Sequence, residues 1–235
     1  GLTGVVSGAG DLLKSGSGTL RLSGVNSYGN TLVQDGTLIG NTSSISGHIG
    51  NDATVVFDQS IDGTFAGNIG AMVGPGGVMV KQGAGKLTLS GLSGLNWSIE
   101  AGGLSTAAER FDGNADIATG ASLTFEQKTN AIYGGVLSGI GQFIKTGTGT
   151  LVYDGDSSAF AGDTTIADGG LIVGSDAAHA AATLGGSFDV QGGGTLGGHG
   201  TLGSGSGSTV TIASGSTLAP GNSIGTINID GNLAF

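Results

Sequence analysis

The sequence predicts an all-β fold, a parallel β-solenoid with short loops and little helix, and three of its features point there. Glycine accounts for 52 of the 235 residues and proline for only 2, as is typical of short strands joined by tight turns. Apolar and polar residues alternate over short runs before a glycine, as in residues 20–22, and this period of two indicates strands. The third feature is internal repetition, which favours a solenoid because short strands bury their inner faces only when similar coils stack.

One unit occurs three times, each time around a lysine. The copies read G-D-L-L-K-S-G-S-G-T-L-R-L-S-G, G-V-M-V-K-Q-G-A-G-K-L-T-L-S-G and G-Q-F-I-K-T-G-T-G-T-L-V-Y-D-G, and their lysines are Lys14, Lys81 and Lys145. The differences between these positions are 81 − 14 = 67 and 145 − 81 = 64. Since such a period is too long for one coil, we expect about three coils of roughly 22 residues in each repeat. The predicted organisation is one continuous solenoid over 1–235, with repeat units at about 1–76, 77–140 and 141–192 and distinct C-terminal coils over 193–235.

The repeats also indicate which residues fill the core. Segments T-V-V-F-D-Q, ending at Gln59, and S-L-T-F-E-Q, ending at Gln127, precede the second and third copies and extend the similarity. Helix is expected only as a turn or two within residues 106–110 and 176–183. The predicted aliphatic core ladder consists of Leu20, Leu22, Leu32, Leu38, Leu87, Leu89, Leu151, Ile166 and Leu171.

The charge and the lack of cysteine exclude several classes of protein. The formal net charge is −10, with 17 acidic and 7 basic residues, so nucleic acid and anionic membrane surfaces are poor partners. Without cysteine there are neither disulfides nor thiolate metal sites. No apolar run approaches the roughly 20 residues of a membrane-spanning helix. Because the chain begins at Gly1 without a signal peptide, we expect it to be a piece of a longer protein.

Two stretches resemble a known family. The unit K-x-G-x-G-T-L-x-L-S-G followed by N-S-Y, as in residues 14–28, resembles the passenger-associated repeat of bacterial autotransporters, the type V secreted proteins. The tail, G-G-T-L-G-G-H-G-T-L from Gly193 and L-A-P-G-N-S-I-G-T-I-N-I-D-G-N-L from Leu218, is similar to the passenger segment that precedes the translocator barrel.

The resemblance implies a right-handed parallel β-helix that is exported through the outer membrane and displayed at the cell surface or secreted. It also implies that C-terminal coils fold first and template the rest, with the translocator β-barrel of the same precursor as a partner. The missing cysteines fit such a route, since a disulfide formed before export could lock a structure too wide to pass.

Several motifs suggest chemistry, and each has a simpler structural interpretation. Residues 221–225, G-N-S-I-G, match the letters of a nucleophile elbow, but a strand rather than a helix follows, so we expect a turn. His48, His179 and His199 lie in unrelated contexts, and we expect isolated surface or turn histidines. The string G-S-G-S-G-S from Gly203 lacks the lysine and helix of a phosphate loop.

Acidic residues are the other candidates for a site. Two groups could offer oxygen ligands to Ca²⁺, although the calcium nonapeptide repeat is missing, and we expect these side chains to be structural or solvating. Lys14, Lys81 and Lys145 are expected to project from strand ends into solvent, about 14 Å apart at the stacking distance of coils. The sequence thus predicts no catalytic residue, no cofactor and no metal ligand. The two acidic groups are Asp154, Asp156, Asp163 and Asp168, and Asp52, Asp58 and Asp62.

The predicted function is that of a non-catalytic passenger segment that serves as a stalk, an adhesin or both, in attachment or self-association. Its polar faces would meet a host-surface glycan, a matrix protein or a second copy of the chain. The alternative is a parallel β-helix carbohydrate-active enzyme such as a polysaccharide lyase. A third hypothesis is that the segment only drives secretion and that the function lies upstream.

Overall fold

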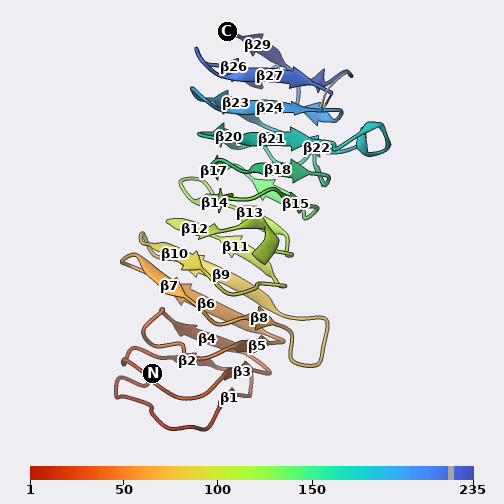
Figure 1. The fold of residues 1–235 in the computed structure, drawn as a ribbon. Coiled ribbons are helices and arrows are strands. Elements are labelled where there is room, and N and C mark those ends of the chain that lie inside the picture. The colour runs from red at the N-terminus through yellow and green to blue at the C-terminus, as the bar shows by residue number, and fades with distance from the viewer. Residues whose placement is uncertain (222–224) are drawn as a thin grey trace. The chain divides into compact units, whose positions relative to one another are not determined.

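A computed structural model of the chain describes residues 1–221 and 225–235. Parallel strands stack into a β-solenoid of about 11 turns with about 3% helix (Figure 1). This confirms the predicted fold class. The contacts divide the chain into two compact units, Gly1–Thr106 and Ala107–Phe235, and the repeat boundaries stay a prediction.

Unit 1 has three walls, each a ladder of parallel strands. The first wall contains β1 (Leu12–Lys14), β3 (Thr31–Val33), β5 (Ile49–Asn51) and β8 (Ile69–Gly70). The second contains β2 (Thr19–Arg21), β4 (Thr37–Gly40), β6 (Thr54–Asp58), β9 (Val78–Gln82) and β11 (Asn96–Ile99). The third contains β7 (Gly63–Phe65), β10 (Lys86–Leu89) and β12 (Gly103–Thr106).

Unit 2 is built in the same way from longer ladders. One consists of β14 (Ser122–Glu126), β17 (Gln142–Thr146), β20 (Asp163–Ile166), β23 (Ser187–Val190), β26 (Thr209–Ile212) and β29 (Asn232–Ala234). A second consists of β15 (Ala131–Tyr133), β18 (Thr150–Tyr153), β21 (Gly170–Val173), β24 (Thr195–Gly198) and β27 (Thr217–Pro220). The others are β13 (Ala115–Ile117) with β16 (Leu137–Gly139), and β19 (Asp156–Ser157), β22 (Thr183–Leu184), β25 (Thr201–Leu202) and β28 (Asn228–Ile229).

The register gives the length of a coil. Thr31 pairs with Ile49 in the next coil, a difference in position of 49 − 31 = 18. Gly170 pairs with Thr195, where the difference is 195 − 170 = 25. The expected coil of roughly 22 residues lies within this spread, and the variation is taken up in the loops between walls.

The repeat is close to the expected length of about three coils, but it is not a whole number of coils. In the first wall the strands follow in the order β1, β3, β5 and β8, so β8 lies three coils after β1. The next strand of the chain, β9, belongs to the second wall. The first repeat therefore spans three coils and one additional side. As a result Lys14 and Lys81 lie on different walls and cannot form one stripe.

Inward side chains of successive coils form the core. Of the predicted core residues, Leu22, Leu38, Leu87, Leu89, Leu151, Ile166 and Leu171 are buried. The prediction was wrong for Leu32, which is partly exposed because its neighbours Thr31 and Val33 take the inward positions of β3. Leu20 is also partly exposed, because β2 ends its sheet and has only β4 beside it.

Aromatic rings reinforce each core. In unit 1 the ring of Phe57 meets Phe65 edge-on, with centroids 5.1 Å apart, and stacks with Trp97 at 6.2 Å. In unit 2 Phe125 lies 5.0 Å from Tyr133 and 5.4 Å from Phe143 in edge-on contacts. Such geometries add to the free energy gained by burial.

Helix occurs where the sequence predicted it, as two single turns of 3-10 helix. These are η1 (Ala108–Arg110) and η2 (Ala177–His179). The side chain of Asp176 caps η2 by accepting the backbone N–H groups of Ala178 and His179, which would otherwise lack partners.

Candidate functional site

The three repeated lysines are the most distinctive polar groups of the structure. Lys14 is 7% exposed, and Lys81 and Lys145 are fully buried. Each ammonium donates three hydrogen bonds to backbone carbonyl oxygens. We call this arrangement the lysine corner.

The three corners use equivalent acceptors. Lys81 Nζ donates to Gln82 O at 2.9 Å, Gly83 O at 2.7 Å and Ala101 O at 2.9 Å. In each corner two acceptors follow the lysine directly and the third belongs to the next coil, so the ammonium joins two coils. The other two sets are Ser15, Gly16 and Asp35 for Lys14, and Thr146, Gly147 and Asp168 for Lys145.

The lysine stems are part of the core. Lys81 pairs with Phe57 on one side and with Ile99 on the other. Lys145 likewise stands between Phe125 and Ile166. The alkyl stem thus occupies an inward position while the ammonium reaches the turn, which is how amphipathic side chains reconcile burial with charge.

The glycine two residues after the lysine is required by the turn. Gly83 has φ +77°, and a Cβ there would lie 2.5 Å from the carbonyl oxygen of Gln59 in the preceding coil. Gly147 has the same φ and would meet Gln127 O at 2.4 Å. An L-residue would be strained twice over, by its φ and by this contact.

The structure corrects the expectation that the lysines project into solvent. Three carbonyl oxygens replace the water that an exposed ammonium would bind, so the charge is buried without being left unsatisfied. Burial lowers the pKa of Lys81 to about 8, with the carboxylates of Asp58 and Asp62 acting in the opposite direction. Burial also lowers the pKa of Lys145, against the effect of Asp168.

In the coil before Lys81 and in the coil before Lys145, a buried glutamine lies beside the equivalent turn. Gln59 Nε2 donates to Ile61 O at 2.7 Å, and its Oε1 accepts from the N–H of Thr42 at 3.1 Å. Gln127 Oε1 accepts from the N–H of Ala108 at 2.6 Å, and its Nε2 donates to Thr129 O at 3.2 Å. The F-D-Q and F-E-Q segments are therefore the polar caps of turns.

The predicted acidic group of unit 1 binds backbone and arginine. Asp52 accepts the N–H groups of Met72, Val73 and Gly74, a segment we call the 72–74 loop. These hydrogen bonds, the one from Met72 first, hold the pKa of Asp52 below its usual range. Asp62 accepts from the N–H of Lys86 at 2.8 Å. Asp58 forms an ion pair with Arg21, Nη1 to Oδ2 at 2.8 Å.

The acidic group of unit 2 is dispersed in the same way. Asp154 accepts the N–H of Ser175 in the next coil at 2.8 Å, and Asp168 accepts the N–H of Gly169 at 2.7 Å. Asp156 accepts from Ser158 N–H at 3.1 Å, while Asp163 is exposed on β20. Over residues 1–221 and 225–235 the structure brings no three His, Cys, Asp or Glu side chains into a cluster that could hold a metal ion.

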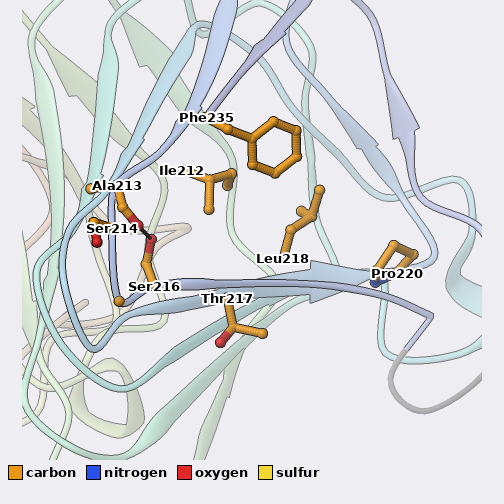
Figure 2. Close-up of a pocket in the computed structure, with 9 residues that line it drawn as sticks. Ile212, Ala213, Ser214, Ser216, Thr217, Leu218, Pro220 and Phe235 are labelled. Atoms are coloured by element: carbon orange, nitrogen blue, oxygen red, sulfur yellow. Dashed lines mark hydrogen bonds between the residues drawn. The ribbon is translucent and has the colours of Figure 1, made fainter.

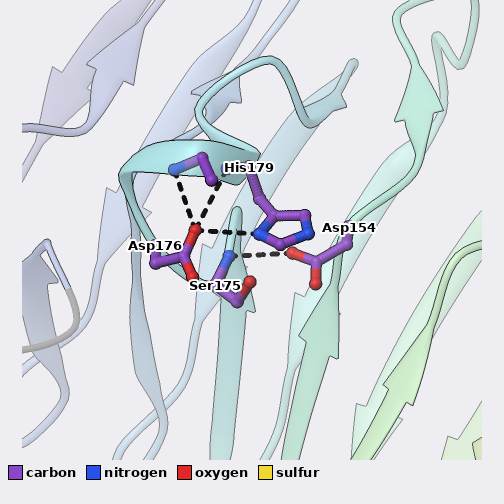
Figure 3. A network of polar contacts seen from close by, with 5 residues as sticks. Asp154, Ser175, Asp176 and His179 are labelled. Atoms are coloured by element: carbon purple, nitrogen blue, oxygen red, sulfur yellow. Dashed lines mark hydrogen bonds and ion pairs between the residues drawn. The ribbon is translucent and has the colours of Figure 1, made fainter.

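The histidines lie in three different settings. His179 Nδ1 lies 2.8 Å from Asp176 Oδ1 at the exposed turn η2, with Asp154 close by (Figure 3). The hydrogen bond to Asp176 raises the pKa of His179 and lowers that of Asp176. His48 Nδ1 accepts the N–H of Asn68 in the next coil. His199 Nδ1 is buried without a hydrogen-bond partner among the described residues.

The predicted turn at 221–225 lies mainly outside the described residues, since 222–224 are not among them. A cavity of about 550 Å³ is lined by residues 212–218, Pro220 and Phe235. Figure 2 shows Ile212, Leu218 and Phe235 directed toward one space. Ile212 and Leu218 stand next to the buried core residues Val190 and Leu196 in the register, while Phe235 is 88% exposed, so this open space is the uncovered end of the core rows and not a separate ligand site.

Among the described residues, no helix has the length and apolar character needed to cross a bilayer.

The similarity of the chain to known proteins includes the three repeats that contain the lysine corners. The passenger-associated-transport-repeat family matches three segments, residues 12–39, 79–105 and 143–173, each of which contains one lysine corner. The chain is also similar to the BmaC autotransporter adhesin of Brucella suis biovar 1 (strain 1330), with 33% identity over 174 residues. That alignment covers 72% of this chain but only 4% of the relative. No solved structure matches the chain.

Fold, corners and repeats define a β-solenoid of passenger-repeat type. The chain is an autotransporter passenger segment with passenger-associated transport repeats. Such a segment implies a surface-exposed or secreted protein.

Proposed function

We propose that this segment is a non-catalytic adhesive stalk displayed at the bacterial surface, exported through the outer membrane with its C-terminal coils assisting folding. The observation that carries the proposal is a polar outer face on unit 2. It is formed by the outward residues of β14, β17, β20 and β23, which we call the polar face. Support also comes from the relative that is named an adhesin.

The register builds the polar face from two rows. One row runs Ser122, Gln142, Asp163 and Ser187 from coil to coil. The second runs Thr124, Ile144, Thr165 and Asp189. Hydroxyl, amide and carboxylate groups follow one another along the ladder at about 4.8 Å, interrupted by Ile144 in the second row. Such an array suits hydrogen bonding to the hydroxyls of a glycan or to the backbone of a matrix protein.

The hydrogen bonds of the repeated polar groups argue against catalysis. The motif lysines and glutamines bond to backbone, and Asp52, Asp62, Asp154 and Asp168 accept backbone N–H groups. A lyase would need carboxylates free to bind Ca²⁺ and a base beside the substrate. These carboxylates instead tie the turns together.

The test is binding of the immobilised chain to a panel of host glycans and matrix proteins. We expect a ligand on the panel whose binding falls at least tenfold when Asp163 and Asp189 are both replaced by Lys. Asp112→Lys, an exposed carboxylate outside the polar face, is the control and should retain binding. Equal loss in the control would show a general charge effect. No binding by the wild type would contradict the adhesive role, and deletion of 1–235 from the full precursor would then measure its role in surface display.

A further inference from the structure

A second outer face of unit 2 carries no charge. It is the sheet of β15, β18, β21, β24 and β27, which we call the neutral face; in Figure 1 four of these strands, β18 to β27, lie one above another. None of these five described strands contains Asp, Glu, Lys, Arg or His. In a chain of net charge −10, this sheet presents no charged side chain that would repel a second copy.

The neutral face is not flat, because its outward side chains differ in size and exposure. Its central outward row runs Ile132, Val152, Ile172, Gly197 and Ala219 by the strand register. Ile132 is 67% exposed and forms a knob at one end of this row. Two strands further along, Ile172 is only 7% exposed.

A groove lies beside Ile172. It has a volume of about 540 Å³ and is lined by Thr148, Thr150, Gly169, Gly170, Ile172, Gly193, Thr195 and Ala219. Glycine at the outward position Gly170 helps keep the groove open, and a second outward glycine, Gly197, stands next to Ile172 in the register. A Cβ at Gly197 would lie 2.5 Å from the carbonyl oxygen of Ala219, so the structure requires glycine there.

We propose that the neutral face binds a second copy of this chain, with Ile132 of each copy inserted into the groove of the other. The arrangement is isologous, since knob and groove belong to the same surface and a two-fold axis near Val152 exchanges them. Burial of the Ile132 side chains against Ile172 supplies the apolar contact. Because the net negative charge opposes association elsewhere on the chain, added salt should strengthen the pairing by screening that repulsion.

A second copy fits this face better than an ionic ligand does. The groove offers threonine hydroxyls, backbone and one isoleucine, with no charged side chain to recognise a phosphate, a sulfated sugar or a basic peptide. The proposal is independent of the proposed function, because it concerns the neutral face and not the polar face.

The test is sedimentation velocity of the 235-residue chain over a range of concentrations, at low and high salt. The wild type should form dimers, with more dimer at high salt. Ile132→Asp places a carboxylate in a groove that offers no charged side chain to pair with it and should weaken association at least about tenfold. Ile140→Asp is the matched control, since Ile140 is 60% exposed in the same unit but outside the neutral face.

A second variant fills the groove instead of changing the knob. Gly170→Val adds a side chain whose Cβ would lie 2.9 Å from Thr150 Oγ1, so the Thr150 side chain must shift to admit it, and valine suits a strand. It should abolish dimers while circular dichroism stays native. A monomeric wild type would overturn the proposal. So would association of Ile132→Asp and Gly170→Val equal to that of the wild type, which would indicate pairing through the ends of the strand ladders.

Discussion

Replacing Lys81 with Met tests the lysine corner directly. Methionine keeps an unbranched apolar stem between Phe57 and Ile99 but donates no hydrogen bond. The carbonyl oxygens of Gly83 and Ala101 then lose the ammonium that binds them at 2.7 and 2.9 Å.

The structure sets the size of the effect. An unsatisfied buried carbonyl costs about 1–3 kcal/mol, and the lower end applies because these turns are only partly buried. Gln82 O keeps the N–H of Gln59 at 2.8 Å and adds little. Removing the desolvated ammonium offsets part of the loss. We expect the free energy of unfolding to fall by about 1–2 kcal/mol.

The single tryptophan makes the measurement local. Trp97 is 2% exposed and pairs with Met79, two residues from Lys81 in β9. Its fluorescence during urea unfolding reports this coil even where the solenoid does not unfold as one unit. The control is Lys86→Met, which removes the same charge from an exposed position of β10 and should change the midpoint little. A Lys81→Met chain as stable as this control would refute the reasoning.

Three further predictions follow from the same turns and loops. Gly83→Ala should cost about 1–3 kcal/mol in urea unfolding because of the strained φ and the clash with Gln59 O, whereas Gly94→Ala, with no atom within 4 Å of its Cβ, should cost far less. The lowered pKa of Asp52 means that its hydrogen bonds stabilise the 72–74 loop above the ordinary aspartate pKa of about 3.9. The protection factors of the loop amides, which correct for the slower intrinsic exchange at low pH, should fall as pH drops through the folded-state pKa, and unchanged protection factors would contradict the carboxylate's role. Lys81 should titrate near pH 8 by NMR; since its unfolded pKa is about 10.4, its contribution to stability rises with pH between these values, and a folded-state pKa above 10 would be inconsistent with burial.

The sequence was sufficient for the fold because repetition, glycine turns and short alternating strands agree with one another. It was less informative about Lys81 and Lys145, which were expected to be exposed because lysine usually is. The alternation of side chains along a strand could have predicted their burial. Met79 and Phe143 stand two positions before these lysines and point inward, so a strand of period two places the lysines inward as well. The acceptors were beyond sequence reasoning, since one comes from a residue 20 positions on, Ala101.

The partial exposure of Leu32 could not be predicted from the sequence for a different reason. Its strand T-L-V reads equally well with leucine or with its neighbours inward, because a shift of one residue exchanges the two faces of a strand. The register with Ile49 and Asn51 decides for Thr31 and Val33. The neutral face and the polar face depend on the same choice, so neither could be assigned before the register was known.

The central claim is that the lysine of each repeat is an internal cap of the solenoid rather than a surface charge. Brief labelling of the folded chain with an amine-reactive reagent, read by peptide mass spectrometry, tests it at all three corners at once. Lys86 and Lys128 are exposed and should react fully, while Lys14, Lys81 and Lys145 should be protected until the chain is unfolded. Equal labelling of all five lysines in the folded chain would contradict the account.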